Sequence, residues 1–295
     1  MNRYRKFRLL NSKGTYFELT EKNFKVFANN PRGLGFSKTA SVLRLGDENF
    51  LTYIMYNLDT IETEILFYDD NIADKYQKYV DFIHFLSFKP IYLLYQRPNS
   101  FDWYRRRIEA MSLSKSEVSF DDSMLHCPLV MQPLTFWEDN EVNVIETNNT
   151  DVDGGKIYPI TYPFTYGKNS LTNIHLYSNG LIDTPLKLTI NGRVTDPQYI
   201  IYNEQNEIYG RGKFNGTFDN VFVNSNESEE EIQLMYNSLI LDNPLGYQDL
   251  TIGSPDEIYV TFLKAKAGLN KISFIVDVGF EGSVRIEWRN RYVTI

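Results

Sequence analysis

The residues that come nearest to metal chemistry form half of a calcium-type loop. Asn149, Asp151 and Asp153 place oxygen atoms at the first, third and fifth positions, and Gly154 stands at the sixth. Such a loop needs a bidentate glutamate at its twelfth position, but Ile160 stands there. The segment is therefore interpreted as a solvated loop, and we predict no metal site and no cofactor.

Cys127 follows directly on His126, which suggests a thiol nucleophile beside its base. In an extended segment, neighbouring side chains point to opposite faces, so these two cannot pair locally. A buried structural cysteine is the simpler interpretation. The chain also lacks the Gly-x-Ser-x-Gly, His-Glu-x-x-His and Walker-type motifs. We therefore predict no catalytic residue and no enzyme activity.

The clearest cluster of basic and aromatic residues lies in an extended segment at 103–107. Arginine and aromatic residues are enriched where subunits meet, whereas nucleic-acid stacking is the alternative use of such a cluster. On a strand, the first and third arginines share one face and the second lies on the other. The residues that we predict at a subunit interface are Trp103, Tyr104, Arg105 and Arg107.

A second group of aromatic residues crowds a proline-containing segment after residue 157. Such rings can stack on sugars, although packing between domains is the more ordinary use of them. The weak candidates for carbohydrate contact are Tyr162, Phe164 and Tyr166.

The first half of the chain has the pattern of an α+β domain. Apolar residues alternate with polar ones over 61–67, which predicts a half-buried strand. Residues 69–71 are candidates to cap a helix, which Pro90 ends before a buried strand at 91–96. The apolar stripe that we expect on this helix is Ile72, Tyr76, Tyr79, Val80, Ile83 and Leu86.

The second half has the pattern of an all-β domain. Residues 186–190 alternate and run into Asn191-Gly192, a strong hairpin signal. Residues 272–278 and 284–288 alternate in the same way, which predicts a sandwich or jelly roll. A polar segment at 138–156 separates the halves, so we predict domains at 1–145 and 146–295.

Charge is spread unevenly between the two halves. Residues 1–140 hold 18 basic and 18 acidic side chains, whereas residues 141–295 hold 12 and 20. Neither half has the basic excess of a nucleic-acid binder, so we predict no sequence-specific nucleic acid as a partner. A single cysteine excludes an internal disulfide framework. We find no secretory signal and no apolar run of ~18 residues, and expect a protein made in the cytoplasm with no membrane partner.

The segment NNPRGLGF, residues 29–36, is rich in turn residues. Proline fixes its own φ and asparagine tolerates left-handed backbone, so we predict a turn. A dinucleotide fingerprint would need a third glycine and a helix directly after it. Together with FRLLNSKGTYFELT at 7–20, the segment resembles the N-terminal pattern of the distal tail protein (Dit) family of long-tailed bacteriophages, or of the equivalent hub in phage-derived tail-like particles.

Later segments fit the same family. TIETEILFYD, KYQKYVDFIHFLSF and PIYLLYQ match its N-terminal domain in order and length, and GSVRIEWRNRYVTI resembles its C-terminal strand. The resemblance implies a mainly β protein. Its N-terminal domain would be a β-rich α+β ring-forming domain with one amphipathic helix, and its C-terminal domain a galectin-like or jelly-roll β-sandwich.

The resemblance also implies a structural function without catalysis. A homohexamer would form a ring that joins the tail tube protein to the tail-tip or tail-associated protein, and to a receptor-binding protein for host adsorption. The protein would be assembled in the bacterial host cytoplasm and located in the virion, at the phage tail tip. Two alternatives stay open: a carbohydrate- or cell-wall-binding β-sandwich module without a ring and, less favoured, a glycan hydrolase.

Overall fold

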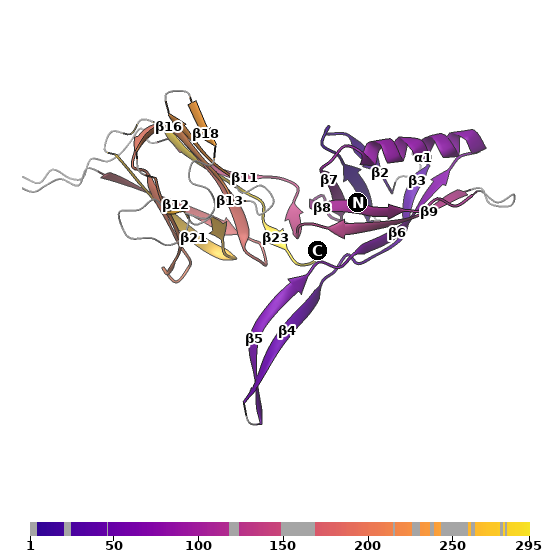
Figure 1. The fold of residues 1–295 in the computed structure, drawn as a ribbon, viewed down its shortest axis with the longest axis horizontal. Helices are drawn as coiled ribbons and strands as arrows, with labels where there is room; N and C mark the ends of the chain where they lie inside the picture. Colours follow the sequence, from indigo (N-terminus) through magenta and orange to yellow (C-terminus); the bar gives the residue numbers. More distant parts are fainter. Residues whose placement is uncertain are drawn as a thin grey trace, which may run out of the picture. The chain divides into compact units, whose positions relative to one another are not determined.

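The contacts in a computed structural model divide the chain into two compact units, and each is described here by itself (Figure 1). The first unit is Met1–Glu141 together with Arg291–Ile295, and the second is Val142–Asn290. The structure describes residues 5–20, 25–45, 47–117, 124–148, 169–214, 216–225, 231–236, 239–242, 259–260, 263–277, 280 and 282–295.

The first unit is built on a nine-stranded sheet in which every pairing is antiparallel. Its main path runs in the order β2 (Tyr16–Glu18), β1 (Lys6–Leu10), β7 (Ile91–Gln96), β8 (Trp103–Leu113), β9 (Met124–Pro133), β6 (Ile61–Tyr68) and β3 (Val26–Arg32). The short strand β10 (Trp137–Asp139) pairs with β8 and with β23 (Arg291–Tyr292). The last residues of the chain are therefore part of this sheet.

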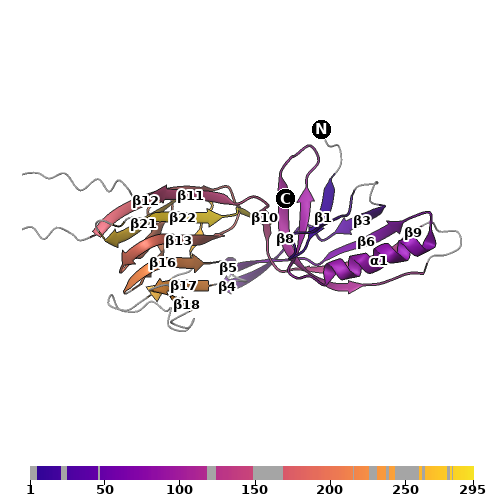
Figure 2. The ribbon, with the colours of Figure 1, turned by 90° about the horizontal axis from the view of Figure 1, so that it is seen from above.

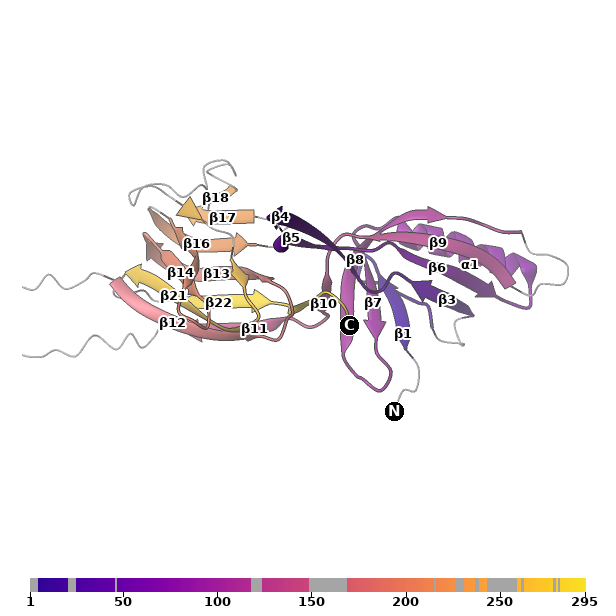
Figure 3. The ribbon, with the colours of Figure 1, turned by 90° about the horizontal axis from the view of Figure 1, so that it is seen from below.

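The helix predicted after residue 71 is confirmed as α1 (Ile72–Leu86). The Asn71 side chain caps it by accepting a 3.0 Å hydrogen bond from the backbone N–H of Ala73. The helix packs along β6 and β9 (Figure 3). Within the described residues, no helix has the length and hydropathy that a membrane span requires.

The face that this helix buries agrees only in part with the predicted stripe, of which Tyr76, Tyr79 and Leu86 pack against the core. Phe82 and Phe85 are buried, as is Lys75. The Phe82 ring lies 4.8 Å from Phe17 and 5.8 Å from Phe67, centroid to centroid. Large phenyl rings bury more apolar area than aliphatic side chains do, and this decides which side of the helix faces the core. The predicted stripe members that stay exposed are Ile72, Val80 and Ile83.

The turn predicted at 29–36 is found only in part, because residues 29–32 continue β3, whose register to β6 shifts between Asn29 and Arg32, as in a bulge. Asn30 is left-handed with φ +48° and Gly33 with φ +76°. A Cβ atom on Gly33 would lie 1.9 Å from the carbonyl oxygen of Thr60, so only glycine fits here without movement. The indole Nε1 of Trp137 donates to the carbonyl of Leu34 at 3.1 Å. The segment after β3 is thereby held against the sheet, and it leads into a separate hairpin of β4 (Ser37–Leu45) and β5 (Glu48–Asn57).

The second unit is a sandwich of two antiparallel sheets around one core (Figure 2). One sheet contains β11 (Asn143–Asn148), β22 (Ser283–Trp288), β13 (Thr184–Thr195), β16 (Thr217–Asn224), β17 (Glu231–Tyr236) and β18 (Leu239–Asp242), with β20 (Lys264–Ala265) on β13. The other contains β12 (Asn169–Ser178), β21 (Gly268–Asp277), β14 (Gln198–Tyr202), β15 (Ile208–Lys213) and β19 (Tyr259–Val260). Leu188 and Ile286 from the first sheet share the core with Ile272 and Phe274 from the second.

The hairpin predicted at Asn191-Gly192 is wrong. Strand β13 continues through both residues, and its register to β16 shifts between Asn191 and Val194, as in a bulge. The backbone N–H of Gly192 donates to the Asn220 side chain at 3.2 Å, and Gly192 has φ +112°. Pairing with strands on both sides thus overrides the local turn preference, whereas the alternation of β22 predicted its strand correctly.

Candidate interaction surfaces

Trp103 and Tyr104 begin β8 and make their ring contacts inside the first unit. The Arg8 guanidinium carbon lies 3.9 Å from the centroid of the half-buried Trp103 ring. The Tyr104 side chain is buried, and Tyr292 meets its ring edge-on at a centroid distance of 5.6 Å. Tyr104 therefore serves the core that joins β8 to the C-terminal residues.

Arg105 belongs to a buried ion cluster that spans three strands. The carboxylate of Glu138 on β10 accepts from Arg105 Nη2 at 3.4 Å and from Arg291 Nε on β23 at 3.1 Å. Arg291 is only 2% exposed and Glu138 8%. A charge so far from water needs a close partner of opposite sign. Glu138 and Arg291 were missed from the sequence because the pair is separated by 153 residues.

The next arginines of β8 alternate in burial. Arg106 is fully buried, with Nε donating to the carbonyl of Thr135 at 2.7 Å. Burial lowers the pKa of Arg106 to about 10. Arg107 lies half-buried on the other face, and its backbone N–H donates to Thr135 Oγ1 at 3.0 Å. The structure brings Arg105 to a carboxylate within its own unit, and an interface role for Trp103, Tyr104, Arg105 or Arg107 stays a prediction.

The most exposed apolar surface lies on the β4–β5 hairpin, which we call the arm (residues 37–57). Its two strands pair with each other and form a sheet of their own (Figure 1). Seven large apolar side chains on it are between 44% and 57% exposed. They are Val42, Leu43, Phe50, Leu51, Tyr53, Ile54 and Met55.

Both faces of the arm are apolar. The register places Val42 opposite Leu51 on one face and Leu43 opposite Phe50 on the other. An antiparallel sheet with one solvated face normally shows polar residues on that face, and an isolated two-stranded hairpin is marginal in water. Exposed apolar patches of this kind mark protein interaction sites. The arm is therefore suited to being covered on both faces by other protein surfaces.

A second exposed apolar surface lies on α1. Ile72, Val80 and Ile83 are 58%, 53% and 45% exposed. Their spacing places them on one side of the helix, beside the face that Phe82 and Phe85 bury. We call these three residues the helix flank.

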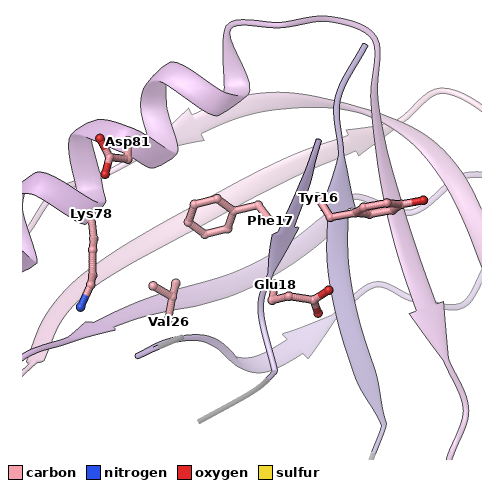
Figure 4. A pocket seen from close by; sticks show the side chains of 6 residues that line it. All are labelled: Tyr16, Phe17, Glu18, Val26, Lys78 and Asp81. Atoms are coloured by element: carbon pink, nitrogen blue, oxygen red, sulfur yellow. The ribbon is translucent and has the colours of Figure 1, made fainter. Parts of the chain in front are cut away.

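A small pocket opens between β2, β3 and α1 (Figure 4). Its volume is about 190 Å³. Lys78 on its rim forms an ion pair with Asp69, and Asp81 accepts from Gln77 at 2.8 Å. Sites for small molecules usually measure roughly 300–1,000 Å³. This pocket is too small to support a small-molecule site.

The thiol and imidazole candidates do not form a catalytic pair. Cys127 is buried, as predicted, and burial raises the pKa of its thiol to about 11. His126 is half-exposed on the other face of β9, with Nδ1 2.9 Å from Glu64 Oε1. Among the described residues, no group of three or more His, Cys, Asp or Glu side chains could hold a metal ion. The loop beginning at Asn149 and the candidates Tyr162, Phe164 and Tyr166 lie outside those residues.

Comparison with known proteins extends these observations. Residues 6–134 match the family described as "Distal tail protein, N-terminal domain". Searching curated proteins gave no match. The phage p2 baseplate in its activated conformation with Sr contains a chain that is similar to this one, with 14% identity and a TM-score of 0.61. The alignment covers 99% of this chain and 100% of the baseplate chain. With Ca, the same baseplate gives 13% identity and a TM-score of 0.58, with coverage of 99% and 100%.

The phage SPP1 Dit protein has a similar fold. It is described as a paradigm of the hub adsorption apparatus of phages that infect Gram-positive bacteria. It shares 10% identity and a TM-score of 0.58, with coverage of 96% of this chain and 98% of its own. The mainly β fold of these proteins thus extends over both units of the chain.

Proposed function

We propose that this chain, whose residues 6–134 match the distal tail protein N-terminal domain, is a structural hub of a phage tail that works as a homohexameric ring. The arm is the single observation that carries ring formation. Its two apolar faces are uncovered in the single chain, and exposed apolar surface of that extent is typical of assembly. The family resemblance supplies the expected number of six subunits.

In this proposal the ring joins the tail tube protein to the tail-tip protein and carries receptor-binding protein for host adsorption. The protein would then be located at the tail tip of the virion. The half-buried Trp103 and Arg107 would add to the interface at the rim of the ring-forming domain.

We further propose that the protein has no catalytic activity of its own. Cys127 is buried with its thiol pKa raised, and a thiol rather than a thiolate is a poor nucleophile. His126 lies on the opposite face of the strand, beside Glu64. The purified full chain should therefore not hydrolyse cell-wall glycans or peptides. Turnover that is lost on a single carboxylate substitution would contradict this part of the proposal.

The test of the ring is the mass and shape of the full chain in solution. Light scattering should give about six times the chain mass of 34.5 kDa, and negative-stain images should show closed rings. A double variant of the arm, Leu51→Lys with Ile54→Lys, should stay monomeric because it places charge on an apolar contact surface. The matched control is Leu181→Lys with Ile208→Lys, two residues of the second unit that are 64% and 58% exposed.

The control should form the same particles as the unchanged chain. A full chain that stays monomeric at high concentration contradicts the proposal and favours the ring-free binding module. Rings that persist in the arm variant show that the arm does not hold them together.

A further inference from the structure

We propose that the ring closes head to tail, with the arm of each copy packed on the helix flank of the next copy. This inference rests on the proposed hub function and names the two surfaces that meet. The occupant of the helix flank is therefore a second copy of this chain, and the flank is the centre of the surface that covers one face of the arm.

Neither surface is covered by its own chain. The seven apolar residues of the arm and the three of the flank are all 44–58% exposed. The arm precedes β6 and the helix follows it. The two surfaces thus depart from opposite ends of this eight-residue strand, which spans about 27 Å. A separate copy is needed to bring them together.

The two surfaces match in chemistry. Residues 49–58 of the arm and its base contain no charged side chain, and the charged residues of its other strand and turn lie at the two ends of the hairpin: Lys38, Arg44, Asp47 and Glu48. On the helix itself, the positions that share the side of the flank are also uncharged, and include Ala73 and Tyr76. The charges that border this side are those of Lys115 and Glu117, which contact Tyr76 and form an ion pair with each other. Contact between them would remove apolar area from water without burying an unpaired charge, which is the favourable case for a lasting interface.

The exposed area of the whole arm reaches the size of a specific interface. Seven large side chains, each about half exposed and divided between the two faces, present on the order of 600 Å² of apolar surface. The face that the flank covers supplies about half of this area. Covering both faces with an equal area of partner surface gives about 1,200 Å² in total, the lower end for stable complexes.

Symmetry favours the helix flank over a second arm as the covering surface. If the arms of two copies packed on each other, the contact would be isologous and would be satisfied in a dimer. Two different surfaces make a heterologous contact, which every copy repeats with the next until the ring closes. The presence of two separate apolar surfaces on one unit is what a ring of more than two copies requires.

Cross-linking between variants that each carry one added cysteine tests this contact directly. Leu51→Cys marks the arm and Val80→Cys marks the helix flank, and both positions are more than half exposed. The natural Cys127 is fully buried, so it should not react with a short bismaleimide in the folded protein. The two variants are mixed under conditions that let subunits exchange, then treated with the reagent.

We expect covalent dimers in the mixture and at least about tenfold fewer when either variant is treated alone. A mixture of Leu51→Cys with Leu181→Cys of the second unit is the matched control and should give no excess over the single variants. As an independent readout, Val80→Glu should raise the concentration needed for ring assembly at least about tenfold. Gln77→Glu on the same helix, outside the flank, should leave it unchanged.

The possible failures are distinguishable. If rings form normally but the mixture of variants gives no cross-linked dimers, the head-to-tail contact is wrong and the hub function stands. The same holds if Leu51→Cys alone gives as many covalent dimers as the mixture. Unchanged assembly of Val80→Glu also overturns the contact. A full chain that never assembles overturns both the contact and the proposed function.

Discussion

Substitution of Glu138 by glutamine should strongly destabilise the first unit. The change keeps the size of the side chain but removes the negative charge that faces Arg105 at 3.4 Å and Arg291 at 3.1 Å. At an effective dielectric constant of about 20, one ion pair at such a distance is worth ~5 kcal/mol before the cost of desolvation. Removing one partner from a buried pair typically costs ~3–5 kcal/mol.

The burial of the three side chains refines this range. Arg291 is 2% exposed at its side chain, so water cannot replace the lost carboxylate there, whereas the 17% exposed Arg105 side chain is partly solvated. The amide oxygen of glutamine can still accept one hydrogen bond. We therefore expect a loss of about 3 kcal/mol in the free energy of unfolding, a large share of the ~5–15 kcal/mol of an ordinary domain.

Urea unfolding followed by tryptophan fluorescence measures the effect. Trp103 and Trp137 report the first unit, whereas Trp288 reports the second, whose transition should stay in place. The matched control is Glu109→Gln on the same sheet, which breaks an ion pair with Lys89. The side chain of Glu109 is 32% exposed and that of Lys89 is 60% exposed. An exposed pair contributes less than about 1 kcal/mol. Equal effects of the two substitutions would refute the reasoning about burial.

Four further outcomes are expected. The pKa of Asp69 is held well below its usual range, chiefly by Lys78, so the unfolding free energy of the unchanged chain should exceed that of Asp69→Asn above pH ~4. That advantage should shrink as the pH falls further, because protonation removes the stabilising charge. Gly33→Ala should cost clearly more than about 1 kcal/mol, whereas Gly14→Ala, at φ +74° with open space around it, should cost only the backbone strain. A thiol reagent should label Cys127 only after denaturation, since the side chain is fully buried. Deletion of Arg291–Ile295 should lower the midpoint of the first unit in urea at least as much as Glu138→Gln, and unchanged midpoints would show that β23 contributes nothing.

Local pattern predicted the elements whose stability is decided locally. The cap at Asn71 and the helix from Ile72 follow from side chains within one turn of each other. The alternation of Val284, Ile286 and Trp288 predicted a strand with one buried face, and all three side chains are buried. Cys127 was predicted to be buried from the ordinary behaviour of a free cysteine, and it is.

Features that depend on distant partners could not be predicted in this way. The buried side of α1 is chosen by Phe17 and Phe67, which belong to other strands. The Glu138–Arg291 pair joins residues that are 153 positions apart in the chain. At Asn191-Gly192, neighbouring strands on both sides hold β13 straight against its turn preference.

The arm was missed for a different reason. A half-buried strand is recognised by the alternation of apolar and polar residues, but residues 50–55 are apolar or neutral on both faces. A sequence of that kind fits a fully buried strand equally well, and only the structure shows that its own chain leaves it uncovered. In our proposal, this is the part of the candidate site that a second copy of the chain covers.

Native mass spectrometry of the full chain at low micromolar concentration tests the central claim most directly. Our account predicts one dominant species at about six times 34.5 kDa, and monomers for Leu51→Lys with Ile54→Lys under the same conditions. Monomers of the unchanged chain, or hexamers that the arm substitutions leave intact, would contradict it.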